Sequence, residues 1–236
     1  MICTKDVMTA LNTLGKPAKA EHLSRFFKTG KGQYGEGDRF LGVTVPEQRR
    51  IAQQFRNAGY DVLEELIRSP YHEHRLTALL ILCDKFQKEK TEEGRKACID
   101  FYVSHTAHIN NWDLVDLSCY KLLGQWLENR DRSLLYSWAE ENDLWKQRIA
   151  IVTCMHFVRR GDFQDCFSIA DKLLHHPHDL IHKAVGWLLR ETGKKDRTAL
   201  VGFLRTRYRE MPRTMLRYAI EHFPPEERKK YLCSEI

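Results

Sequence analysis

The sequence is poor in residues that break helices. Its 236 residues include only 7 prolines and 13 glycines, and four of the glycines fall within residues 29–40. No stretch shows the alternation of apolar and polar residues that marks a half-buried strand. The scarcity of breakers and of strand patterns excludes a sheet-based fold and predicts an all-α chain.

The sequence also lacks the marks of a membrane or secreted protein. No apolar run approaches the ~20 residues that span a bilayer, and the first residues lack the basic-then-apolar order of a signal peptide. None of the seven cysteines forms a CxxC pair, and most lie in apolar helical runs. We therefore expect buried, reduced thiols, a cytoplasmic location and no membrane partner.

Common catalytic and metal motifs are missing too. The histidines of residues 72–74, 105–108 and 175–178 have neither HExxH spacing nor the cysteine partners of a zinc site, and GxSxG does not occur. We expect these histidines in loops and at helix ends, and we expect no metal and no organic cofactor.

A repeat of about 35 residues runs through most of the chain. Five copies begin an apolar helical run with a cation, namely Arg50, Arg75, Arg148, Lys183 and Arg217, and the last three are 35 and 34 residues apart. A period of this length with two helices per unit is typical of HEAT-like α-solenoids. The partner helix of each copy is amphipathic and is expected at residues 61–67, 94–103, 133–139, 163–174 and 197–208. The sequence thus predicts an α-solenoid of stacked HEAT-like helical pairs, forming one domain over residues 1–236.

The same repeat has a consequence for charge. The net charge is +6 and the pI about 8.9. Equivalent positions of stacked repeats line one surface, so the five cations are expected to form a row along a concave basic groove suited to a phosphate backbone. The alternative for any one of them is a structural ion pair with a neighbouring repeat.

The middle repeat breaks this row. It places Asp113 and Asp116, just after Trp112, where the other copies place a cation. Trp112 and Asp116 are four residues apart and share a helix face, and Trp187 lies four residues after Lys183 in another copy. Two indoles and a carboxylate are therefore candidates for one site in the groove. Asp113 has a simpler interpretation as the cap of its helix, whereas Asp116 lies too far inside the helix for that role.

Residues 29–40, TGKGQYGEGDRF, form a glycine-rich segment. One interpretation is a phosphate-cradling nucleotide loop, but no strand precedes it and no GK[ST] ends it. The better interpretation is a flexible loop between the first helices that touches a DNA backbone through Lys28, Lys31 and Arg39.

Several segments together resemble the bacterial DNA alkylation repair proteins of the AlkD type, a family of HEAT-like-repeat alkylpurine DNA glycosylases. They are residues 25–28 (RFFK), 109–118 (INNWDLVDLS), 144–151 (LWKQRIAI), 178–196 (HDLIHKAVGWLLRETGKKD) and 211–223 (MPRTMLRYAIEHF). The resemblance covers nearly the whole chain. It implies a solenoid that wraps duplex DNA and a monofunctional glycosylase acting on cationic N3- or N7-alkylpurines, associated with the nucleoid and acting as a monomer.

The resemblance also assigns residues. It implies that Trp112, Trp187 and Asp116 contact the lesion-bearing nucleotide and that Arg148 and Arg190 contact the DNA. Phe26 matches an aromatic position that is tyrosine in the best-known members. The glycine-rich segment is longer than the corresponding turn of those members, and the family also holds proteins that bind DNA without excising bases.

The expected chemistry fits these residue types. A purine alkylated at N3 or N7 is cationic and leaves without a general acid, while a carboxylate stabilises the oxocarbenium-like sugar or positions water. Indole faces attract cations by about 0.5–2 kcal/mol each. Base excision from alkylated duplex DNA is the leading hypothesis, a non-catalytic DNA-binding scaffold is the second, and a protein-binding solenoid is the third.

Overall fold

The computed structural model describes residues 2–236, and all regular structure within that range is helical. The sole β-type contact of these residues is an isolated bridge between Arg39 and Tyr71. The all-α prediction is therefore confirmed. The contacts of the chain divide it into two compact units, Met1–Ser118 and Cys119–Ile236, which we describe separately.

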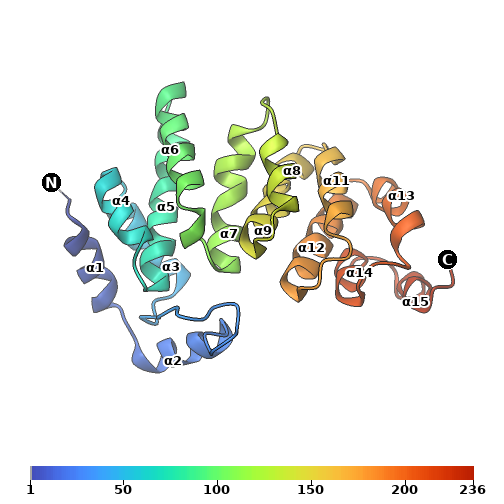
Figure 1. Cartoon of the computed structure of the whole chain (residues 1–236), viewed down its shortest axis with the longest axis horizontal. Coiled ribbons are helices and arrows are strands. Elements are labelled where there is room, and N and C mark those ends of the chain that lie inside the picture. Colours follow the sequence, from blue (N-terminus) through green and yellow to red (C-terminus); the bar gives the residue numbers. More distant parts are fainter. Residues whose placement is uncertain (1) are drawn as a thin grey trace. The chain divides into compact units, whose positions relative to one another are not determined.

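The first unit is built around one long helix. Its elements are α1 (Thr4–Thr13), α2 (Pro17–Phe26), α3 (Val45–Gln54), α4 (Tyr60–Ile67), α5 (His72–Lys88), α6 (Glu92–Ser104), the 3₁₀ turn η1 (Thr106–His108) and α7 (Trp112–Cys119). Helix α5 packs against α3, α4 and α6, and α4, α5 and α6 lie side by side in Figure 1. It is buried on nearly all sides, as expected of a central helix.

The second unit contains the π-helical turn η2 (Tyr120–Gly124), α8 (Ser133–Glu140), α9 (Leu144–Thr153), α10 (Met155–Val158), α11 (Gln164–Lys172), α12 (Asp179–Lys195), α13 (Arg197–Arg207), α14 (Arg213–Ala219) and α15 (Pro225–Cys233). Helix α12 is the long element here and packs against α9, α13 and α14. Gly186 lets α12 pack closely on α14, because a Cβ at this position would lie 2.5 Å from the Tyr218 Cβ and 2.6 Å from the Met215 carbonyl oxygen.

Local signals in the sequence set the helix ends. Thr44 caps α3 in a capping box with Glu47, Asp143 accepts the backbone N–H groups of Trp145 and Lys146 at the start of α9, and Asp196 caps α13. The expected partner helices are present as α4, α6, α8, α11 and α13. The five cations lie on α3, α5, α9, α12 and α14, but none begins its helix, and Arg50 and Arg217 lie in the second halves of α3 and α14, which corrects that part of the prediction. The alternation of two helices per repeat is thus present in both units.

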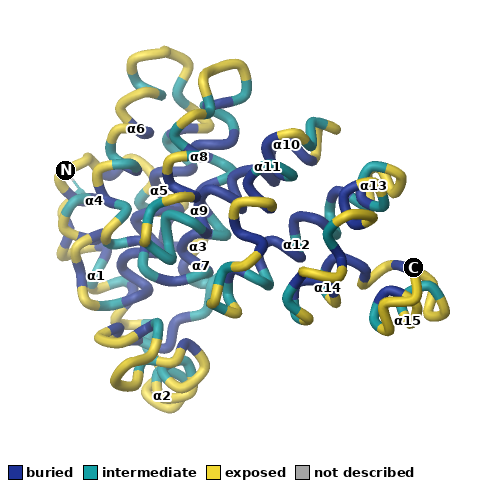
Figure 2. The backbone as a smooth tube through the Cα atoms, turned by 45° about the vertical axis from the view of Figure 1, so that its right-hand side comes forward, coloured by how far each residue is buried: buried dark blue, intermediate teal, exposed yellow. Residues whose placement is uncertain are grey.

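Helix α2 and the segment after it differ from the rest of the first unit. No residue of α2 is fully buried, and Figure 2 shows this part of the chain mainly in the exposed and intermediate classes. In Figure 1 the segment that joins α2 to α3 passes below the ends of α3 and α5. We call residues 29–40 of this segment the Gly-rich loop.

Candidate functional site

Helix α5 begins with four consecutive polar residues that are all buried. His72, Glu73, His74 and Arg75 are 2%, 1%, 3% and 4% exposed. Polar and charged groups are seldom buried to this degree unless each has a partner of opposite charge or a hydrogen bond. The partners of His72, Glu73 and Arg75 come from the Gly-rich loop, the residues just after it and the start of α7.

Asp38 of the Gly-rich loop is the centre of these contacts. Its carboxylate accepts a hydrogen bond from Arg75 Nη2 at 2.6 Å and lies 3.4 Å from His72 Nδ1. The side-chain amides of Asn110 and Asn111, just before α7, donate to it at 3.1 and 3.4 Å. Burial alone would raise the pKa of Asp38, but the His72 hydrogen bond and the Arg75 charge outweigh burial and lower that pKa.

His72 joins Asp38 to α7. Its Nε2 lies 2.8 Å from Asp113 Oδ2, so both ring nitrogens face carboxylates. Burial opposes a charge on the ring, yet the charge of Asp113 and the hydrogen bonds to Asp113 and Asp38 raise the pKa of His72 to about 9. The imidazole is therefore protonated at neutral pH and donates to both carboxylates.

Two side-chain hydrogen bonds hold the first turn of α7. Asn111 Oδ1 accepts the Trp112 backbone N–H at 2.9 Å, and Asp113 Oδ1 accepts the Leu114 N–H at 2.9 Å. Asp113 thus combines a hydrogen bond to the first turn with its contact to His72. Trp112 and Asp116 lie one turn apart on this helix, and each is partly exposed. The sequence prediction that they share a face of one helix is consistent with α7.

An aromatic cluster surrounds the start of α7. The Trp112 ring is stacked on Phe27, with centroids 5.3 Å apart and planes at 25°, and it meets Phe26 edge-on at 6.1 Å. Phe27 is buried, whereas Phe26 is 56% exposed. The sequence pointed to Phe26 alone, but Phe27 covers more of the indole face.

The C-terminal end of the Gly-rich loop, with the residues just after it, is held against α5. Beside the Asp38 contacts, the Glu73 carboxylate accepts the backbone N–H groups of Leu41, Gly42 and Val43 at 3.0, 2.8 and 3.2 Å. Phe40 is buried next to these residues. These contacts correct the expectation of a flexible loop, because its last residues are bound to the buried start of α5.

Two of the predicted DNA-contacting arginines are buried. Arg75 binds Asp38 and donates to the Ser69 carbonyl oxygen at 2.8 Å. Arg148 is 5% exposed, and its Nη1 donates to the Leu180 carbonyl oxygen at 2.5 Å. Neither side chain presents surface to a phosphate, which corrects the expectation of a continuous row. Arg75 instead forms a structural ion pair, the alternative to a phosphate contact that the sequence left open.

The other predicted cations are more accessible. Arg50, Arg217 and Lys28 are exposed on α3, on α14 and at the end of α2. Lys183 pairs with Asp179 at 2.7 Å, and Arg190 pairs with Glu221 and Glu191. On α12, Trp187 follows Gly186 and is partly exposed. The Lys183 pair is exposed and therefore weak, so a phosphate can compete for Lys183, whereas the Arg190 side chain is only 20% exposed.

The histidines and cysteines give no sign of metal binding. Among residues 2–236 no group of three or more His, Cys, Asp or Glu side chains is arranged to hold a metal ion. The cysteines are free thiols, and burial raises the pKa of Cys154 and Cys166, which disfavours the reactive thiolate. Within the same range no helix combines the length and apolar character needed to cross a bilayer.

Comparison with known proteins places the chain in a family. The family model described as DNA alkylation repair enzyme matches residues 7–223. The chain belongs to this family. Its membership supports a role in DNA alkylation repair and agrees with the resemblance carried by the INNWDLVDLS and HKAVGWLLRE segments.

A solved structure has the same fold. The protein described as a predicted DNA alkylation repair enzyme from Enterococcus faecalis matches with a TM-score of 0.70 and 16% sequence identity. The match covers 89% of this chain and 97% of that one. At this identity the likeness concerns the fold alone, which is helical and solenoid-like. No curated protein sequence matches the chain.

The sequence alone does not point to Asp38, His72 or Phe27. Asp38 is one acidic residue in a loop marked by its glycines and cations, and the sequence places His72 only in a loop or at a helix end. A usable signal did exist, since HEHR places four polar residues at the start of a strongly apolar helix. Such a run requires buried partners, although the sequence does not say which ones.

Proposed function

We propose that this protein is a monofunctional DNA glycosylase that hydrolyses the N-glycosidic bond of cationic N3- or N7-alkylated purines in duplex DNA. The observation that carries the proposal is α7, where a partly exposed indole and a partly exposed carboxylate lie one turn apart on a helix whose start is fixed by buried hydrogen bonds. We assign the lesion contact to Trp112 and Trp187 and the catalytic charge to Asp116.

The proposed reaction needs little from the protein. The base already carries the positive charge that makes it a leaving group, so no general acid is required. As the bond breaks, positive charge grows on the sugar, and the Asp116 carboxylate stabilises it and orients the attacking water. The indoles attract the cationic base. This chemistry proceeds without a metal or an organic cofactor, and one chain is sufficient for it.

Exposed cations provide the proposed DNA contacts. Arg50, Arg217 and Lys28 face solvent, and Lys183 and Arg190 are partly exposed. Each phosphate that such a side chain neutralises releases counterions, which gives salt-dependent and sequence-independent affinity. We therefore propose duplex DNA containing alkylated bases as the partner, which suits a cytoplasmic protein close to the nucleoid.

A second function, DNA binding without base excision, is favoured by one observation. One face of Trp112 is already stacked on Phe27, which reduces the indole surface open to a nucleotide. This stacking suits a protein of this fold that holds DNA without acting on a base.

One experiment separates the two functions. Duplex DNA methylated with a simple alkylating agent is mixed with excess protein, and released methylpurines and duplex affinity are both measured. The glycosylase proposal predicts release of N3- and N7-methylpurines well above the spontaneous rate. Tight, salt-sensitive binding with release at the spontaneous rate would support the binding function instead.

A further inference from the structure

The two ends of the Gly-rich loop converge on one imidazole ring. Phe27, just before the loop, and Phe40, its last residue, lie with their centroids 5.0 and 4.7 Å from that of His72. The two phenyl rings are also stacked on each other at 5.2 Å. Because Phe27 in turn stacks on Trp112, a continuous series of ring contacts runs from His72 to the indole proposed to touch the lesion.

The polar contacts of His72 follow the same route. On one side its Nδ1 faces Asp38 in the loop, and on the other its Nε2 faces Asp113 in the first turn of α7. Arg75, one turn along α5, binds the other oxygen of Asp38. The charged side chains that contact His72 or its partner Asp38 are therefore two carboxylates and one guanidinium, and a protonated imidazole balances the charges of these three.

Gly35 of the loop packs closely against the backbone of the residues just before the loop. Gly35 donates its N–H to the Lys28 carbonyl oxygen at 3.2 Å, and a Cβ at Gly35 would lie only 2.4 Å from the Phe27 carbonyl oxygen. The loop thus packs directly on the backbone of the residue that stacks on Trp112.

We propose that His72 is a positioning residue of the α7 site, which joins the Gly-rich loop to the start of α7 and so fixes Trp112 and Asp116 for action on DNA. The part of this statement that concerns base release rests on the proposed glycosylase function. The part that concerns the loop and Trp112 does not depend on it. His72 is buried behind Phe27 and Phe40, so it acts through these neighbours and not on the substrate.

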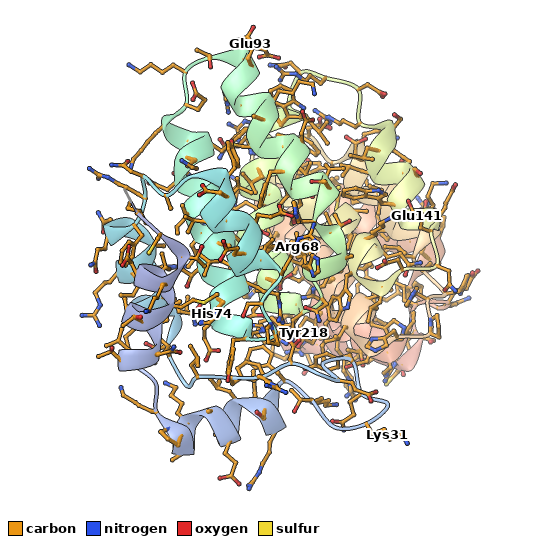
Figure 3. All side chains as sticks on the ribbon, turned by 60° about the vertical axis from the view of Figure 1, so that its left-hand side comes forward. Lys31, Arg68, His74, Glu93, Glu141 and Tyr218 are labelled. Carbon is orange, nitrogen blue, oxygen red and sulfur yellow. The ribbon has the colours of Figure 1, made fainter. Side chains whose placement is uncertain are left out.

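The first test measures the loop directly. Lys31 lies at the outer margin of the molecule in Figure 3, within the loop, and offers trypsin a cleavage site. His72→Gln removes the two-sided bridge, and His156→Gln is the matched control because His156 is also buried and pairs with a glutamate outside this region. We expect cleavage at Lys31 to be faster by about tenfold or more in folded His72→Gln and unchanged in His156→Gln, because loss of the bridge favours local opening.

The second test needs no substitution at His72 and so stands even where His72→Gln fails to fold. Wild-type protein is labelled with 5-fluorotryptophan, and the Trp112 resonance is assigned with Trp112→Phe. Raising the pH through about 9 should deprotonate His72, shift the Trp112 resonance and accelerate cleavage at Lys31 relative to an unfolded peptide of the loop sequence. A Trp112 resonance and a normalised cleavage rate that stay constant from pH 7 to pH 10 would overturn the proposal.

The third test links the bridge to base release. In folded His72→Gln we expect single-turnover release of methylpurine to fall by about tenfold while duplex affinity changes less than twofold, since the exposed cations are untouched. Full release activity in a variant with a loosened loop would show that the bridge does not position Asp116. If wild type releases no base, the glycosylase proposal fails alone, and the loop and Trp112 measurements still decide the role of His72.

Discussion

The fold should lose stability in mild alkali as the buried His72 loses its proton. His72 has a pKa of about 9 in the folded chain and close to 6.5 in the unfolded chain. A group whose pKa is raised by folding stabilises the fold fully below its unfolded pKa, and this contribution disappears as the pH rises through the folded pKa. The window is therefore pH 6.5 to 9, in which stability should fall.

The magnitude follows from the two pKa values. At roughly 1.4 kcal/mol per pH unit the full contribution is about 3 kcal/mol. About 2 kcal/mol of it should be lost between pH 7 and pH 9. His72 is 2% exposed, so solvent does little to screen this contribution. The substitution His72→Gln lowers stability at pH 7 and removes the proton whose release causes the fall.

The assay is urea unfolding of wild type and His72→Gln at pH 7, 8 and 9 under reducing conditions. Buried thiols such as Cys154 and Cys166 also lose stability in alkali, because their pKa values are raised by burial while unfolded thiols ionise. This effect is common to both proteins and cancels in the difference. Parallel curves for wild type and His72→Gln over this range would refute the assignment of a buried, protonated His72.

Other outcomes follow from the same structure. Arg75→Ala should cost about 3–5 kcal/mol in unfolding free energy, because it leaves Asp38 buried with one cation fewer, and calorimetry or urea unfolding measures it. Arg217 is exposed, so Arg217→Ala should leave stability unchanged but lower the slope of log affinity against log salt by about one. A salt titration of duplex binding measures this slope, and an unchanged slope would remove Arg217 from the interface. Gly186→Ala should destabilise by about 1–3 kcal/mol, because the new methyl group meets the α14 backbone; a wild-type melting temperature would contradict this packing. Stability should also fall below pH 6.5, because burial lowers the pKa of His74 to about 4 and the unfolded chain therefore takes up a proton at higher pH than the folded chain. In acid unfolding curves, His74→Asn should reduce this loss of stability.

The sequence predicted the helices better than their contacts. The 35-residue period located α9, α12 and α14, because the spacing of apolar residues along a helix is a local signal. The same period predicted that equivalent cations share one environment. Arg75 and Arg217 hold the same place in the predicted repeat, yet Arg75 is buried and Arg217 is exposed. The difference arises because Arg75 binds Asp38, which comes from a loop 37 residues away in the chain.

The site was predicted in part for the same reason. Trp112 and Asp116 could be placed on one helix from their spacing alone. The link from Asp38 through His72 to Asp113 joins three segments that are distant in the chain, and neither periodicity nor propensity carries information about it. Asp113 was expected to cap α7, and it does accept a hydrogen bond in the first turn, but its second oxygen binds His72.

If Asp116 lowers the barrier to base release, removing its charge should slow that step alone. Single-turnover release of a cationic methylpurine from duplex DNA is measured for wild type, for Asp116→Asn and for Asp100→Asn, an exposed control on α6. Asp116→Asn keeps the size of the side chain and removes its charge, so we expect a rate lower by about 10²-fold or more, with duplex affinity equal or slightly higher. Asp100→Asn should match wild type. Equal release rates for wild type and Asp116→Asn would contradict the account.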